Sequence, residues 1–65
     1  MKTWLVKDEN NSVHRHNEFG DAPEWIGNLI QTAEGIPYFY TMGDNRTFDR
    51  DEAKQISVWL DEMTD

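Results

Sequence analysis

The sequence predicts an α+β fold, in which two helices pack on a small antiparallel sheet of two or three strands, in the order β-β-α-β-α. Three observations lead to it. The chain has 65 residues, which suits one domain spanning residues 1–65. Its three Trp, two Tyr and three Phe are enough for a core, because each ring can bury roughly 150–250 Å². The chain consists of short segments in which apolar residues alternate, as in strands, and of two segments in which they have helical spacing.

The N-terminal segment has the alternation of a β-hairpin. In residues 2–7, Trp4 and Val6 fall on the same face of a strand. Residues 8–12 are polar and rich in Asn, which is typical of a turn. Residues 13–17 are therefore expected to return as the second strand.

Residues 21–35 carry the signals of a first helix. Asp21 is the expected N-cap, Glu24 completes a capping box, and Gly35 is the expected left-handed residue after the last turn. Apolar residues recur between them at spacings of three and four: Ala22, Trp25, Ile26, Leu29, Ile30 and Ala33. This spacing predicts one buried face of a helix.

The C-terminal half predicts a strand and a second helix. Residues 38–42 are dense in aromatics and favour a strand, and residues 43–45 have turn chemistry. Asp49 is the expected N-cap of the second helix, and Glu52 completes its capping box. The expected buried face of this helix consists of Ala53, Ile56, Trp59, Leu60 and Met63.

The charge of the chain restricts its partners. Thirteen Asp and Glu against six Lys and Arg give a formal charge of −7. Direct nucleic-acid binding and contact with an anionic membrane are not expected, because both need a basic surface. The expected partner is a protein with a basic surface. The competing interpretation is that the acidity only keeps a small protein in solution.

Cysteine and hydropathy bear on the compartment. The chain has no Cys, which excludes disulfides and thiolate metal sites and fits a cytoplasmic location. The N-terminal residues do not have the pattern of a signal peptide. No segment approaches the roughly 20 apolar residues of a membrane span.

Residue patterns for catalysis and for cofactors are missing. There is no phosphate-binding loop, and Ser12 and Ser57 lack the flanking glycines of a nucleophile elbow. We therefore expect no enzyme activity and no cofactor. His14, His16 and Glu18 alternate along a predicted strand and are competent metal ligands, but no fourth ligand is evident. No metal is expected there, and a His-based metal-binding domain is kept as an alternative.

The outer face of the second helix is the expected partner-binding site. It has an apolar residue at its centre and carboxylates toward the C-terminal end, where the helix macrodipole disfavours anions. Its candidate residues are Asp51, Val58, Asp61, Glu62 and Asp65. A second candidate patch consists of Asp44, Arg46 and Asp49.

These features favour a small acidic inhibitor that occupies a basic surface of its partner. Its spaced carboxylates would imitate a nucleic-acid backbone, and its size and charge are typical of phage-encoded anti-defence proteins. A second hypothesis is a structural or assembly module, either a homodimer or a small subunit, that uses exposed aromatics such as Tyr38 or Tyr40. An affinity for the partner that falls steeply with salt indicates the acidic inhibitor, and an affinity that barely responds to salt indicates the assembly module.

Overall fold

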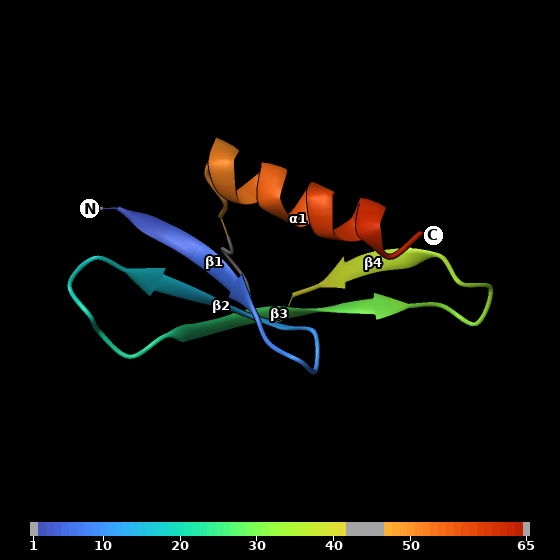
Figure 1. Ribbon diagram of the computed structural model, residues 1–65, viewed down its shortest axis with the longest axis horizontal. Helices are drawn as coiled ribbons and strands as arrows, with labels where there is room; N and C mark the ends of the chain where they lie inside the picture. The colour runs from blue at the N-terminus through green and yellow to red at the C-terminus, as the bar shows by residue number, and fades with distance from the viewer. Residues whose placement is uncertain (1, 42–46, 65) are drawn as a thin grey trace.

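The residues that the structure describes form a two-layer α+β arrangement with one sheet and one helix. The computed structural model describes residues 2–41 and 47–64. The four strands are antiparallel and lie in chain order: β1 (Thr3–Lys7), β2 (Ser12–Asn17), β3 (Glu24–Gln31) and β4 (Pro37–Tyr40). Helix α1 (Arg50–Glu62) lies across one face of this sheet (Figure 1).

The order β-β-β-β-α contradicts the predicted order and strand number. The sheet has four strands instead of two or three, and the described residues contain one helix instead of two. The error lies in residues 21–35, where the predicted first helix is wrong. That segment contains strand β3 and parts of the connections on either side of it.

A β-bulge explains why this strand imitates a helix. Val13 of β2 lies opposite Gly27, but His14 lies opposite Trp25, so Ile26 is an extra residue in β3. The extra residue resets the alternation of the strand. Ile26 and Leu29 therefore both face α1 and are both buried, although they are three residues apart. That spacing is also the spacing of one helix face.

The predicted caps of that helix serve turns between strands. The carboxylate of Asp21 accepts a hydrogen bond from the Asn17 side chain, with a nitrogen–oxygen distance of 3.2 Å. Gly35 has a φ of 85° and its N–H donates to the Thr32 carbonyl oxygen at 2.9 Å, which closes the turn from β3 to β4. A left-handed glycine suits a helix end and a turn equally, so it does not distinguish between them.

The core lies between the sheet and the helix. It is built from apolar side chains of three strands and α1: Leu5, Val13, Ile26, Leu29 and Ile56. Gly27 is required by close packing on the same side, because a Cβ there would lie 2.6 Å from Cζ of Phe39 and closer still to the Tyr40 carbonyl oxygen. The bulge therefore brings β3 and β4 together more tightly than a side chain at this position permits.

The C-terminal helix begins where the sequence predicts. The Asp49 side chain accepts from the backbone N–H of Glu52 at 2.8 Å, and the Glu52 side chain accepts from that of Asp49 at 3.2 Å, so the capping box is confirmed. Ile56 is buried and Trp59 is half-buried. Ala53 is exposed, contrary to prediction, because Glu52 faces the sheet instead. No helix among residues 2–41 and 47–64 is long and apolar enough to cross a bilayer.

Candidate functional site

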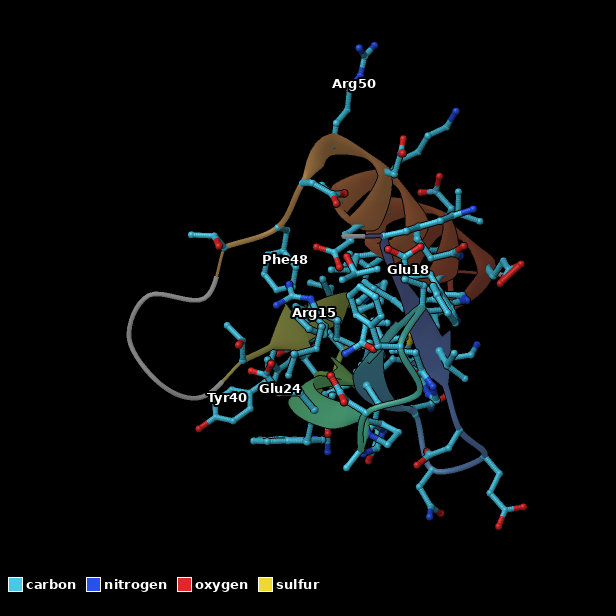
Figure 2. The ribbon with its side chains drawn as sticks, turned by 90° about the vertical axis from the view of Figure 1, so that its left-hand side faces the viewer. Arg15, Glu18, Glu24, Tyr40, Phe48 and Arg50 are labelled. Atoms are coloured by element: carbon cyan, nitrogen blue, oxygen red, sulfur yellow. The ribbon has the colours of Figure 1, made fainter. Side chains whose placement is uncertain are left out.

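A partly buried ion pair lies beneath the first turn of α1. Arg15 projects from the helix side of β2 and donates from Nε to Glu52 Oε2 at 2.9 Å and from Nη2 to Glu52 Oε1 at 3.1 Å. Its Nη2 also donates to the carbonyl oxygen of Thr47 at 2.8 Å. Figure 2 shows Arg15 next to Phe48, and the guanidinium carbon lies 5.8 Å from the centre of that ring.

A polar groove of about 420 Å³ surrounds this ion pair. Its lining is mostly polar and comes from the ends of three strands and the start of the helix: Thr3, Arg15, Asn17, Ala22, Glu24, Thr47, Asp49 and Glu52. Every buried side-chain nitrogen or oxygen among the described residues has a hydrogen-bond partner. Arg15 and Glu52 are therefore both engaged in joining α1 to the sheet.

The second feature is the sheet face turned away from α1, which we call the open face. Strand alternation and the bulge determine its members. They are Trp4, Val6, Ser12, His14, His16, Trp25, Asn28, Ile30, Tyr38 and Tyr40. Figure 2 shows Tyr40 on the side of the sheet away from the helix. Among the described residues, no element covers this face (Figure 1).

The open face carries no Lys, Arg, Asp or Glu within the strands. The three charged residues of the strands are Lys7, Arg15 and Glu24, and the strand pairing places all of them on the helix side. Charged residues flank the strands: Lys2 precedes β1 and Glu18 follows β2, and the Glu18 carboxylate accepts from the backbone N–H of Lys2 at 3.3 Å. The strands of an acidic protein therefore present one face without Lys, Arg, Asp or Glu.

The rings of the open face are held in place by contacts with their neighbours. Trp4 stacks on His16, with 6.1 Å between ring centres and 18° between ring planes. The indole N–H of Trp25 donates to the side-chain oxygen of Asn28 at 2.8 Å. Because this donor is satisfied within the face, burial of Trp25 against a partner leaves no unpaired N–H.

Four residues of the open face are exposed beyond what a core or a polar surface requires. Trp4 is 42% exposed, Val6 40%, Tyr38 41% and Tyr40 46%. The three rings alone leave roughly 250 Å² in solvent, if each has a total area of about 200 Å². Trp4 and Val6 lie on edge strand β1 and the two tyrosines on edge strand β4, so the half-buried members of β2 and β3 connect them. The largest apolar patch on an ordinary monomer is about 300–600 Å² and is often functional.

The residues predicted on the outer helix face lie on the exposed side of α1. Asp51, Val58, Asp61 and Glu62 are all exposed and lie opposite the buried Ile56. Asp65 lies outside the described residues. The last turn of α1 contains no basic residue, so no side chain there offsets the two carboxylates.

The predicted second patch is only partly described. Asp44 and Arg46 lie outside the described residues. Asp49 is engaged as the N-cap of α1, since its carboxylate accepts from the N–H of Glu52. Its carboxylate therefore has the capping role that the sequence also predicted.

The two histidines lie on the open face, but the structure does not gather a ligand set around them. His14 and His16 lie on the same face, whereas the Glu18 carboxylate accepts from the backbone of Lys2. Residues 2–41 and 47–64 contain no group of three or more His, Cys, Asp or Glu positioned to hold a metal. The histidines instead contribute flat, weakly polar rings to an aromatic surface.

No family model, curated protein or solved structure matches the chain in the three comparisons made.

Proposed function

We propose that this protein is a binding module that docks onto another polypeptide through its open face. The observation that supports the proposal is an aromatic, charge-free sheet face that no described element covers. An antiparallel sheet with one solvated face ordinarily alternates between apolar residues inside and polar residues outside. Here six of the ten members of the open face are apolar or aromatic and none is Lys, Arg, Asp or Glu, so this face is richer in rings than a solvated face ordinarily is.

The rings supply the anchors of such an interface. Tyr and Trp dominate the energetics of protein interfaces, because they bury a large area with few rotatable bonds. Trp4 and Trp25 are additionally fixed by the stack on His16 and the hydrogen bond to Asn28. Anchors that are ordered before binding lose less entropy when the partner arrives.

The chemistry of the open face also indicates the class of partner. Aromatic platforms bind single-stranded nucleic acid, but they do so next to Lys and Arg that neutralise phosphates. The strands place no cation on this face. A polypeptide with an apolar, uncharged surface fits it better. The proposed role is therefore binding and not catalysis, and the Cys-free composition favours the cytoplasm as its location.

A second candidate function uses the other side of the molecule. Asp51, Asp61 and Glu62 are exposed along the outer side of α1, with Val58 exposed between them at 43%. This arrangement suits the inhibitor of a basic, nucleic-acid-binding surface. Its attraction to the partner would act over a distance and would weaken with salt.

Site-specific photo-crosslinking separates the two candidates. A photoreactive phenylalanine derivative replaces Tyr40 in one variant and Val58 in another, since the two native side chains are similarly exposed on opposite sides. We expect crosslinked polypeptide from position 40 and little from position 58. Crosslinks from position 58 alone favour the acidic-inhibitor function, and their absence at position 40 contradicts docking through the open face.

A further inference from the structure

We infer that the occupant of the open face is a second copy of this chain, so that two sheets pack face to face in a symmetric dimer. The inference rests on the proposed function and names its partner. Packed antiparallel sheets lie about 10 Å apart with their strands within about 30° of each other. The dimer would thus have four layers, with a helix on each outside and a second core between the sheets.

Charge complementarity favours this occupant. A basic partner gains nothing from the open face, because its strands contribute no carboxylate there, and an acidic partner finds no cation. The surface that matches an uncharged aromatic face is another uncharged aromatic face. This chain offers such a surface at the same concentration as the site itself.

Part of the net charge of −7 on each chain lies far from this contact. Asp51, Asp61 and Glu62 lie on the outer side of the helix layer, so three layer spacings would separate those of one copy from those of the other. At roughly 10 Å for each spacing, the distance is about 30 Å, several times the Debye length of about 8 Å at physiological salt. Repulsion between the two helices is therefore largely screened.

The available area predicts a modest affinity. With its half-buried members added to the exposed rings, the open face offers roughly 500 Å² on each chain, or about 1,000 Å² in the dimer. That area is at the lower limit for a specific interface. We therefore expect a dissociation constant of about 1–100 µM, which makes the dimer concentration-dependent in the test tube.

Three of the aromatic anchors keep their polar atoms paired or near water. The indole N–H of Trp25 is already paired with Asn28. The Tyr38 and Tyr40 side chains come from β4, an edge strand of the sheet, where a hydroxyl can stay near water. Because the two-fold axis repeats every contact, a single unfavourable substitution weakens the dimer at two places.

Sedimentation equilibrium of the full chain tests the inference. The wild-type protein should move from the 7.7 kDa monomer mass toward twice that mass as its concentration rises to about 0.5 mM. Tyr40→Glu buries two carboxylates in the dimer and should weaken association about 100-fold. His14→Glu should do the same from a central strand, which separates face packing from pairing of sheet edges.

Val58→Glu is the matched control, because it places the same charge at a similarly exposed apolar residue on the helix side. It should leave the association constant within about 3-fold of wild type. Circular dichroism of each variant establishes that its monomer is folded. A wild-type protein that stays at the monomer mass overturns the dimer, as does equal weakening by Val58→Glu. If crosslinks to a different polypeptide still form at position 40, the dimer alone is wrong and docking through the open face stands.

Discussion

Replacing Arg15 with Met would leave the Glu52 carboxylate buried without its cation. The Glu52 side chain is 5% exposed, and the Arg15 side chain that pairs with it is 23% exposed. Met keeps much of the aliphatic length of Arg, so the packing beneath Phe48 changes less than the charge. After the substitution, the carboxylate retains the Thr3 hydroxyl at 3.2 Å and the backbone N–H of Asp49 at 3.2 Å.

The expected loss follows from this burial. Removing one partner of a fully buried ion pair costs about 3–5 kcal/mol, because the remaining charge stays desolvated. Here the groove around Arg15 opens to solvent, so partial hydration of Glu52 reduces the loss to about 2–3 kcal/mol. In a domain of this size, that amount lowers the melting temperature by about 10–20 °C. The total stability of such a domain is about 3–10 kcal/mol, so the variant approaches unfolding at physiological temperature.

Urea and thermal unfolding followed by circular dichroism measure this loss. Arg50→Met is the control, because Arg50 is an exposed cation at the start of α1, and it should change stability by less than about 0.5 kcal/mol. The double variant Arg15→Met with Glu52→Met should lose less than the sum of the single variants, by about 1–3 kcal/mol. A melting temperature for Arg15→Met within about 3 °C of wild type would refute the structural role of the ion pair.

Three further predictions concern the bulge, the cap and the dimer. Gly27→Ala should lower the free energy of unfolding in urea by about 2–3 kcal/mol, because the added methyl group meets Phe39 and the Tyr40 backbone. Gly20→Ala is the control: the space around it is open but its φ is 76°, so it should cost about 1–2 kcal/mol. Equal losses for the two variants would argue against the close approach of β3 and β4 at Gly27. Asp49→Ala should cost about 1 kcal/mol by losing the capping bond, and an unchanged melt would rule out that role. Dimerisation of wild type should strengthen as salt screens the two charges of −7, and weakening in salt would point to ionic contacts instead.

The sequence was sufficient to predict elements with local signals. The cap of α1 depends on Asp49 and Glu52, three residues apart, so its geometry is determined within one turn. The hairpin of β1 and β2 likewise follows from alternation around a polar turn. Strand β3 could not be recognised in this way, because its bulge exists only through pairing with Val13 and His14 of another strand. A spacing of three residues is ambiguous until that register is known.

The candidate site was predicted only in part for a related reason. The strand that holds Tyr38 and Tyr40 was predicted to enter the core, and only the assembly-module hypothesis expected these two rings to be exposed, as they are. Trp25 and Ile30 were assigned to a helix core, but as members of β3 they lie on the open face. The alternations of Trp4 with Val6 and of His14 with His16 were the available signal, since they place uncharged residues on one face of a hairpin. The net charge of the chain favoured the helix as the binding site, although the charged residues of the strands all lie on the helix side and none lies on the open face.

The three tryptophans allow the most direct test of the open face as the contact surface. Trp4 and Trp25 lie on it, whereas Trp59 lies half-buried on α1 with the Lys7 ammonium 5.8 Å from its ring centre. Two-dimensional proton–nitrogen NMR spectra recorded over a concentration series report all three indole N–H groups at once. We predict that the Trp4 and Trp25 signals shift with concentration while that of Trp59 stays in place. A shift confined to Trp59, or three signals that do not respond to concentration, would contradict self-association through the open face.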